Sequence, residues 1–183
     1  VRVPKLYATA AHEDPERYWA IYEDMGELSH QLKDSDYPVA AASIPLWHRL
    51  PFEKVPEHFG GDKPDLGGIL KDISDGYDQI TNRLLTLGLD QDQVAMIKGM
   101  IIGLNGSFDT ETVISHGDYH QGNVSQRGDE FIILDWEYVH HNSVYWDLYC
   151  LLDMSHPDFP KMISPSTRLA ALHAYMNSRA AFG

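Results

Sequence analysis

Residues 114–137, ISHGDYHQGNVSQRGDEFIILDWE, are the most informative stretch of this sequence for both fold and chemistry. Asp118 lies five residues before Asn123, and Asp135 comes twelve residues after Asn123, at the end of the apolar run 131–134. A carboxylate that can receive a proton, followed by an amide and a carboxylate that can share a cation, is the residue set of phosphoryl transfer from a nucleotide. The short spacing lets one loop and one hairpin hold all three groups around a single point.

Each of these polar residues also has a purely structural interpretation. Asp118 could bond its own backbone in a turn, and Asn123 could satisfy nearby loop groups. Asp135 is more informative, because a carboxylate at the end of a buried strand is costly unless it is paired or bound to a metal. Glu137 would point to the same side in an extended segment and could join a second cation. Their combination in one short stretch favours the functional interpretation.

The motif HGDYHQGN at 116–123, followed by IILDWE at 132–137, resembles the aminoglycoside phosphotransferase and choline kinase family. The members of this family are small-molecule kinases with the protein-kinase-like fold. Weaker similarity extends to YEDMG at 22–26, which looks like the hinge between two lobes, and to WDLYCLL at 146–152. The opening segment 1–9 resembles the part that follows the long helix of the small lobe. The resemblance implies ATP and Mg²⁺ as cofactors and a hydroxyl of a small, amino-bearing or otherwise cationic molecule as the acceptor.

The resemblance also assigns roles to the residues that carry the chemistry. By match to the family motif, Asp118 would be the catalytic base. Asn123 and Asp135 would hold magnesium, and Glu137 could be a further metal contact. These four residues are the predicted catalytic and metal site.

Four further residues are assigned supporting roles by the same resemblance. Backbone groups near Glu23 and Met25 would meet the adenine at the hinge. His116 would brace the loop that carries the base, and Asp147 would cap or anchor the structure. Nucleotide binding is therefore predicted at the hinge, and structural support at the two ends of the motif.

The family pattern has parts that this sequence does not show. A phosphate-covering loop and a strand lysine paired with a helix glutamate are needed for phosphoryl transfer. The glycine cluster at 59–68 lies after the hinge and is no G-x-G-x-x-G, and Lys5 follows a proline in the opening segment. In the family these parts lie upstream of the position that matches Val1. We therefore expect residues 1–26 to be a remnant of the small lobe and hinge, residues 27–183 to be the large catalytic lobe, and this chain alone to have little kinase activity.

The fold class predicted is α+β and mostly helical: a protein-kinase-like C-terminal lobe with a short β-hairpin left from the N-terminal lobe. Strand propensity and turn residues predict strands at 3–9, 18–22, 112–115, 123–125 and 130–135. Apolar residues at steps of three and four predict one amphipathic helix over 66–87. Further helices are predicted at 90–104, 147–154 and 166–181, with residues 39–44 as a short helical piece between prolines.

Net charge, hydropathy and cysteine content limit the kinds of partner and compartment that suit this chain. The formal net charge of −13 argues against nucleic acid and anionic membrane surfaces, and it suits either a cationic substrate or simply a solvated surface. No apolar run approaches the ~20 residues of a membrane helix, and no signal peptide is visible. The single cysteine, Cys150, lies in an apolar stretch and fits a reducing compartment. We expect a cytoplasmic protein with a small-molecule partner, and the oligomeric state stays open.

Two other functions are weighed against the kinase. His116 and His120 are four residues apart, the spacing of a metal-binding pair on a helix in a zinc hydrolase. Gly117 and Gly122 make a helix unfavourable there, so this alternative is weak. A kinase-like lobe without a phosphate loop could also be a non-catalytic binding module, which would bind a partner or a substrate without turnover.

Aromatic residues follow Asp135 closely in the sequence. They could line an acceptor pocket and hold a cationic group by cation–π contact, or they could pack the core between hairpin and helices. We favour the core interpretation. The residues concerned are Trp136, Tyr138, Tyr145 and Trp146.

Overall fold

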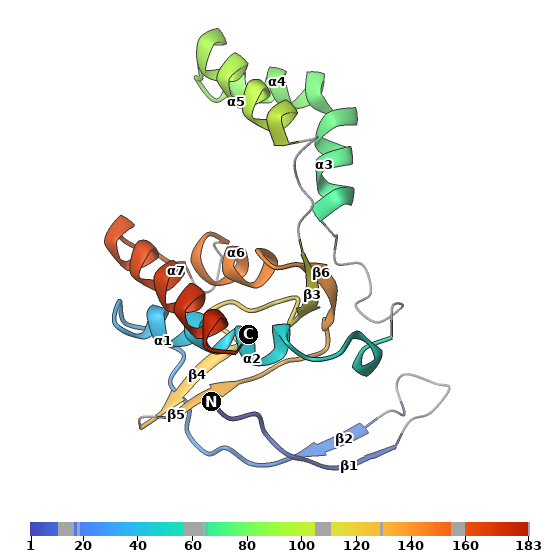
Figure 1. The fold of residues 1–183 in the computed structure, drawn as a ribbon, viewed down its shortest axis with the longest axis vertical. Coiled ribbons are helices and arrows are strands. Elements are labelled where there is room, and N and C mark those ends of the chain that lie inside the picture. Colours follow the sequence, from blue (N-terminus) through green and yellow to red (C-terminus); the bar gives the residue numbers. More distant parts are fainter. Residues whose placement is uncertain are drawn as a thin grey trace.

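The computed structural model describes residues 1–10, 17, 19–56, 64, 66–104, 111–128, 130–154 and 160–182. The predicted α+β, mostly helical class is confirmed (Figure 1). The strands are β1 (Leu6–Ala10), β2 (Trp19–Tyr22), β3 (Thr112–Ser115), β4 (Val124–Arg127), β5 (Glu130–Ile133) and β6 (His140–Ser143). The helices are α1 (Asp36–Ser43), α2 (Pro45–His48), α3 (Leu66–Asp75), α4 (Tyr77–Thr86), α5 (Gln91–Leu104), α6 (Trp146–Leu152) and α7 (Pro165–Ala180), with a 3₁₀ turn at Phe52–Lys54.

The described strands pair as three antiparallel two-stranded sheets: β1 with β2, β3 with β6, and β4 with β5. Single bridges widen the β4–β5 hairpin on both sides. Arg2 pairs with Ile132 on β5, and Ser29 pairs with Gln126 on β4. The segment after β2 and the first residues of the chain therefore flank the hairpin that follows the HGDYHQGN motif.

The core lies where α1 and α7 pack together against α2, α6 and the β3 and β4–β5 strands. Figure 1 shows these elements as the compact lower part of the molecule, with α7 beside α1. The apolar side chains of these elements form one buried cluster, and Tyr119 of the HGDYHQGN motif belongs to it. Its members include Tyr37, Ala40, Ile44, Trp47, Tyr119, Val124, Ile133, Leu148, Leu151 and Tyr175.

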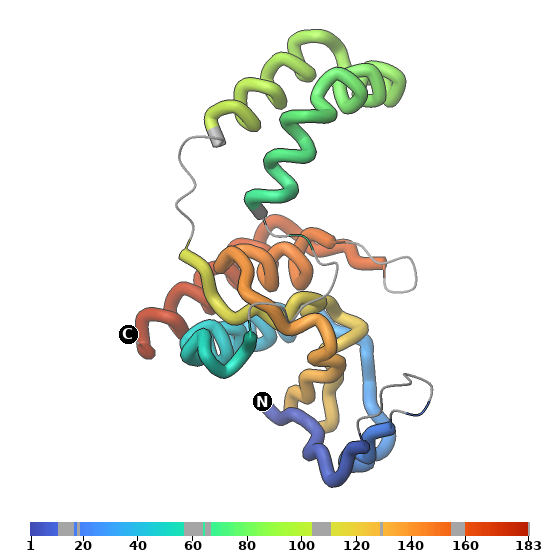
Figure 2. The backbone as a smooth tube through the Cα atoms, turned by 90° about the vertical axis from the view of Figure 1, so that its right-hand side faces the viewer, coloured from blue at the N-terminus to red at the C-terminus, as the bar shows by residue number. Residues whose placement is uncertain are grey.

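Helices α3, α4 and α5 form an arm that stands away from this core in both views (Figures 1 and 2). Val94 on α5 is the only residue of the arm whose described side chain is buried. Met96, Met100 and Ile102 on α5 are exposed. The arm is thus held mainly by helix–helix contacts of its own.

The arm also corrects one prediction. The single helix predicted over 66–87 is broken, because Gly76 ends α3 and starts α4 with a φ of −94° and a ψ of 11°. Gly88 follows α4 in the left-handed region (φ 94°), the conformation that glycine commonly supplies at a helix C-terminus. Asp90 and Gln93 cap α5 reciprocally, since each side chain accepts from the other's backbone N–H at 2.8 and 2.9 Å.

Other boundaries differ from prediction in small ways. The helical piece expected at 39–44 begins earlier, as α1, and continues into α2 through Pro45, which is tolerated at a first helical position. Strand β6 was not predicted, and most of the glycine cluster at 59–68 lies outside the described residues. None of the described helices is both long and apolar enough to cross a membrane.

Candidate active site

The HGD loop, residues 116–123, connects β3 to β4. Its second residue, Gly117, must be a glycine for the loop to adopt this conformation. Gly117 has a φ of 86°, and a Cβ there would overlap the backbone carbonyl of Tyr138. The Gly117 carbonyl accepts a hydrogen bond from the indole N–H of Trp146 at 2.9 Å. A side chain at position 117 would therefore push the loop away from the β5–β6 connection.

The fully buried carboxylate of Asp147 holds the start of the HGD loop. Its Oδ2 accepts from the backbone N–H of His116 at 3.0 Å, and its Oδ1 from that of Gly117 at 3.2 Å. The Ser115 hydroxyl donates to Oδ1 at 2.7 Å. Helix α6 thus contacts the start of the loop through one side chain, and the anchoring role of Asp147 stays a prediction.

Asp147 is held in turn by α2. Trp47 donates its indole N–H to Oδ2 at 2.8 Å, and His48 Nε2 lies 3.2 Å from the same oxygen. Burial alone would raise the pKa of the Asp147 carboxyl, but the hydrogen bonds from His48 and Trp47 outweigh it and bring the pKa to about 2. The group is therefore an ionised carboxylate that the surrounding donors satisfy.

His116 links the loop to the end of β5. Its Nε2 donates to the Leu134 carbonyl at 2.9 Å, and its Nδ1 accepts from the Asp118 backbone N–H at 3.3 Å. Burial lowers the pKa of His116 and outweighs the opposite effect of Asp147. A neutral imidazole with its proton on Nε2 fits both contacts. His116 therefore contacts both the HGD loop and the end of β5, and its bracing role stays a prediction.

Asp118 and Asn123 meet at one point, although five residues separate them. The Asn123 amide donates to the Asp118 backbone carbonyl at 2.9 Å and to its Oδ2 at 3.4 Å. The Asp118 side chain is 18% exposed, and His120 Nε2 lies 3.5 Å from Oδ2. The loop thus presents a largely enclosed carboxylate beside an amide whose oxygen is left for another contact.

The hairpin brings the residue before Asp135 into contact with Asn123. The Leu134 N–H donates to the Asn123 carbonyl at 2.9 Å, which extends the β4–β5 ladder by one pair. Asp135 comes next, exposed and with a φ of 59°, the only positive φ of a described residue other than glycine. Such a conformation is strained and is frequent at functional sites. The burial argument for Asp135 was wrong in detail, because the carboxylate itself is not buried.

The backbone conformation of Glu137 also differs from the extended one that was expected. Glu137 lies in a turn closed by the Val139 N–H and the Trp136 carbonyl at 3.2 Å, rather than in an extended segment. Its carboxylate is exposed. The argument that it points to the same side as Asp135 therefore fails, and its metal role stays a prediction from the resemblance.

The oxygen donors fit magnesium better than zinc. Within the described ranges, no group of three His, Cys, Asp or Glu side chains could hold a metal. Magnesium needs no such group, because it takes one or two protein oxygens together with water and phosphate oxygens. Asn123 and Asp135 supply an amide and a carboxylate oxygen of this kind. His116 and His120 are no zinc pair, since His116 uses both ring nitrogens and His120 Nδ1 accepts from the Gly122 N–H at 2.9 Å.

The predicted hinge has backbone groups to offer. Glu23 donates its N–H to the Lys5 carbonyl at 2.8 Å, and its carboxylate pairs with Arg2. Met25 is buried, and its carbonyl accepts from Arg127 at 3.1 Å. Among the residues that the structure describes, neither the Glu23 carbonyl nor the Met25 N–H has a hydrogen-bonding partner. An acceptor and a donor remain there, two residues apart.

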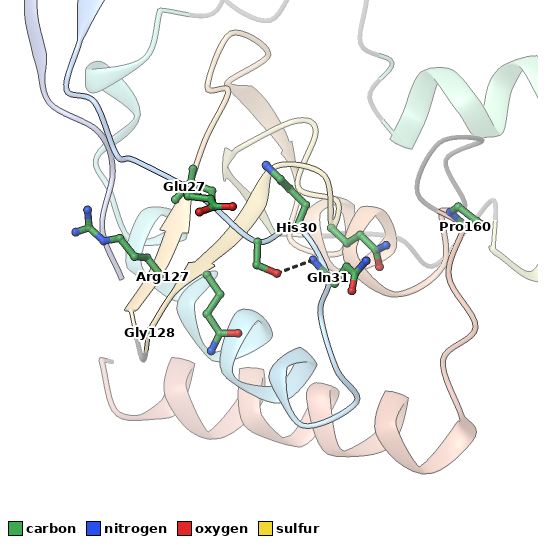
Figure 3. Close-up of a pocket in the computed structure, with 10 residues that line it drawn as sticks. Glu27, His30, Gln31, Arg127, Gly128 and Pro160 are labelled. Atoms are coloured by element: carbon green, nitrogen blue, oxygen red, sulfur yellow. Dashed lines mark hydrogen bonds between the residues drawn. The ribbon is translucent and has the colours of Figure 1, made fainter.

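A hollow of about 780 Å³ lies beside the HGD loop rather than around Asp118 (Figure 3). It is formed by the segment after the hinge and the tip of the β4–β5 hairpin, and Gln121 connects it to the loop. Figure 3 shows Glu27, His30 and Arg127 on its walls. The three predicted chemical residues do not line this hollow, so it is not the reaction point.

The aromatic residues after Asp135 mostly pack. The Trp136 ring lies 4.5 Å from that of His116 and 5.3 Å from that of Trp47, centroid to centroid. Trp146 donates to the loop, as described above, and Tyr145 is 56% exposed. The core interpretation therefore suits Trp136 and Trp146.

The contacts of Asp147 were missed at the sequence level. Trp47 and His48 lie about a hundred positions away from Asp147, and no local spacing connects them. The contact of His120 with Asp118 was missed too, although the motif itself held both residues. The contact goes together with a hydrogen bond from the Gly122 N–H to Nδ1 of His120, which the motif does not reveal.

Comparison with known proteins gives one family. The sequence model described as the phosphotransferase enzyme family matches residues 1–182. No curated protein matches the chain significantly.

Solved structures show the same fold. An aminoglycoside-3'-phosphotransferase of type VIII is 19% identical with a TM-score of 0.52, over 98% of this chain and 71% of that one. Choline kinase from Cryptosporidium parvum Iowa II is 17% identical with a TM-score of 0.51, over 98% and 58%. The streptomycin–ATP–APH(2")-IIa ternary complex is 15% identical with a TM-score of 0.55, over 99% and 62%. The chain therefore spans between 58% and 71% of the length of these structures.

Proposed function

Because the chain belongs to the phosphotransferase enzyme family, we propose that it carries the catalytic lobe of an ATP-dependent small-molecule kinase. The γ-phosphoryl group of ATP would pass to a hydroxyl of a small, amino-bearing acceptor. The observation that carries the proposal is the meeting of Asp118 and Asn123 at one point, with Asp135 placed beside Asn123 by the hairpin. One similar structure holds ATP together with streptomycin. The net charge of −13 suits a cationic acceptor.

Asp118 acts as the base in this proposal. It orients the acceptor hydroxyl and takes its proton while the hydroxyl oxygen bonds to the γ-phosphorus and the bond to the β–γ bridging oxygen breaks. Asn123 and Asp135 hold magnesium through their oxygens. Magnesium, when bound, neutralises charge on the phosphate oxygens. The remaining work of the chain is to keep these groups in line with one another.

Other residues support binding and position. The Glu23 carbonyl and the Met25 N–H meet the adenine, while His116 and Asp147 fix the HGD loop. Glu137 is a further metal contact.

The two-lobe division is part of the proposal, with residues 1–26 as small lobe and hinge and residues 27–183 as large lobe. The β1–β2 hairpin supports it, because Tyr7, Trp19 and Ile21 are all about half exposed or more. A two-stranded ribbon with apolar faces is marginal alone and needs further strands to pack on. Phosphate-binding parts would come from such strands, so the full-length protein is the active form. We place it in the cytoplasm, where the buried Cys150 stays reduced.

The test is phosphoryl transfer by the full-length protein with Mg·ATP and a panel of aminoglycosides, choline and ethanolamine. ADP formation that depends on an acceptor is expected. Asp118→Ala should lower turnover by about 10²–10⁴-fold and leave nucleotide affinity unchanged. Asp135→Ala should also weaken magnesium-dependent nucleotide binding.

An exposed carboxylate on the arm serves as the control. Asp75 pairs with Lys71 at the surface of α3, far from the HGD loop, so Asp75→Ala should leave turnover unchanged. Near-normal rates in Asp118→Ala would refute the assignment of the base. Nucleotide binding without transfer to any acceptor by the full-length protein would favour the non-catalytic binding module.

A further inference from the structure

We propose that His120 is a positioning residue that fixes the orientation of the Asp118 carboxylate. The His120 side chain is 8% exposed and belongs to the same loop as Asp118. Its Nε2 lies 3.5 Å from Asp118 Oδ2. The kinetic part of this proposal rests on the proposed function, and the structural part does not.

The tautomer of His120 is set by the loop itself. The Gly122 backbone N–H donates to Nδ1 of His120 at 2.9 Å. A ring nitrogen that accepts a hydrogen bond carries no proton, so a neutral His120 has its proton on Nε2. That proton is carried by the nitrogen that lies 3.5 Å from Asp118 Oδ2. Gly122 thus sets which proton of His120 is presented to the Asp118 carboxylate.

Gly122 is held from its other side as well. Its carbonyl lies 2.8 Å from Nδ1 of His30, which comes from the segment after the hinge. The Ser125 hydroxyl at the start of β4 contacts the same ring. Figure 3 shows His30 at the wall of the hollow, beside the β4–β5 hairpin. The backbone N–H of Gly122 thus contacts His120, and its carbonyl contacts His30. Through His30, Gly122 is connected to the segment after the hinge and to Ser125 on β4.

His120 acts on the orientation of Asp118 through one carboxylate oxygen, Oδ2. His120 Nε2 and Asn123 Nδ2 both approach Oδ2, at 3.5 and 3.4 Å. A hydrogen bond from Asn123 and a facing His120 nitrogen on the same oxygen resist rotation of the carboxylate about its χ2 bond. A base must hold its acceptor oxygen in a narrow range of positions, and a misplacement of 1 Å can cost about 10²-fold in rate. The loss of the His120 donor should therefore appear in kcat rather than in nucleotide binding.

Two variants separate the two contacts of the ring. His120→Asn places an amide near the position of Nδ1, which keeps an acceptor for Gly122 and removes the donor to Asp118. His120→Gln places an amide near Nε2, which keeps that donor. We expect His120→Asn to lower kcat by about 100-fold with the KM for ATP unchanged, and His120→Gln to keep most of the rate. His173→Gln, at an exposed position on α7, is the control and should behave as wild type.

The readout is acceptor-dependent ADP formation by the full-length protein over a range of Mg·ATP concentrations. Equal losses in the Asn and Gln variants would overturn the proposal, because the donor to Asp118 would then not matter. A change in KM for ATP with kcat unchanged would overturn it as well.

A spectroscopic measurement decides the structural part without any turnover. Long-range ¹H–¹⁵N NMR of the histidine rings should show His120 protonated on Nε2. Asp118→Ala should shift the Nε2 resonance of His120 and leave its Nδ1 resonance in place. A proton on Nδ1, or an Nε2 resonance that ignores Asp118→Ala, would contradict the proposal even if the protein phosphorylates an acceptor. Should the protein phosphorylate nothing, this result still stands by itself.

Discussion

The HGD loop and the α3–α5 arm are held by opposite means. The loop has no regular secondary structure, yet Asp147, His116 and Gly117 tie its start to the buried core. The arm consists of three regular helices, but Val94 is its only buried residue among those whose side chains are described. Regular secondary structure is therefore no guide to rigidity in this molecule. The number of buried contacts is the better guide.

This contrast suits a phosphotransferase. Phosphoryl transfer depends mainly on position, so the groups that act on the reacting atoms belong in the most firmly held part. The arm carries none of the proposed catalytic, metal or hinge residues. Its sequence can therefore change with little effect on the loop.

Removal of the Asp147 carboxylate should have the largest effect on stability. Asp147→Ala leaves the indole N–H of Trp47, the Ser115 hydroxyl and the backbone N–H of His116 without their acceptor. We expect a loss of about 3–5 kcal/mol in the free energy of unfolding. Urea denaturation followed by circular dichroism measures it. A loss below about 1 kcal/mol would mean that the carboxylate does not hold the loop.

A matched pair of glycines compares the two regions directly. Gly117 and Gly88 both have a positive φ, but a Cβ at Gly88 meets nothing within 4 Å, while one at Gly117 meets Tyr138. Gly88→Ala should cost only the backbone strain, about 1–2 kcal/mol. Gly117→Ala should cost more and should also lower phosphotransfer, because the loop must shift. Equal losses in the two variants would remove the steric part of the argument.

Acid should weaken the loop through Asp147. The pKa of this carboxyl is about 2 in the folded protein, against its ordinary value of 3.8 in an unfolded chain. Since the folded pKa is the lower one, its stabilisation is complete above pH 4 and is lost as the pH falls toward 2. The loss amounts to about 2 kcal/mol. The free energy of unfolding should fall less between pH 5 and pH 2.5 in Asp147→Asn than in wild type, as measured by denaturation at both pH values. Equal falls in the two proteins would contradict the lowered pKa of Asp147.

Truncation on the arm should have the smallest effect. Met96 and Met100 are 61% and 54% exposed, so replacement of either by alanine should change the free energy of unfolding by no more than about 0.5 kcal/mol. Ile132→Ala, at a fully buried position of β5, should cost about 2–5 kcal/mol in the same measurement. A large loss in Met96→Ala would show that the face of the arm is covered in solution.

Local patterns in the sequence explain what could be predicted. The β4–β5 hairpin, the cap of α5 and the meeting of Asp118 with Asn123 depend on residues that are close in sequence. The α3–α4 break was missed because the apolar period continues across Gly76. Strand β6, with the sequence HHNS, was missed because its residues favour no strand, and pairing with β3 creates it.

Long-range contacts explain what could not be predicted. Trp47 and His48 reach Asp147 only after α2 packs against β3, and nothing in their local sequence marks them. Such contacts depend on the assembled core, which the spacing of a motif does not contain.

Amide hydrogen exchange tests the central claim most directly, namely that the HGD loop is a rigid, preformed half of an active site. The backbone N–H groups of His116 and Gly117 should exchange only when the whole protein unfolds, because a buried carboxylate accepts both. The amides of α4 should exchange through local opening, at a free energy several kcal/mol lower, since no described residue of α4 is buried. Fast exchange at His116 and Gly117, or equal protection in α4, would contradict the account.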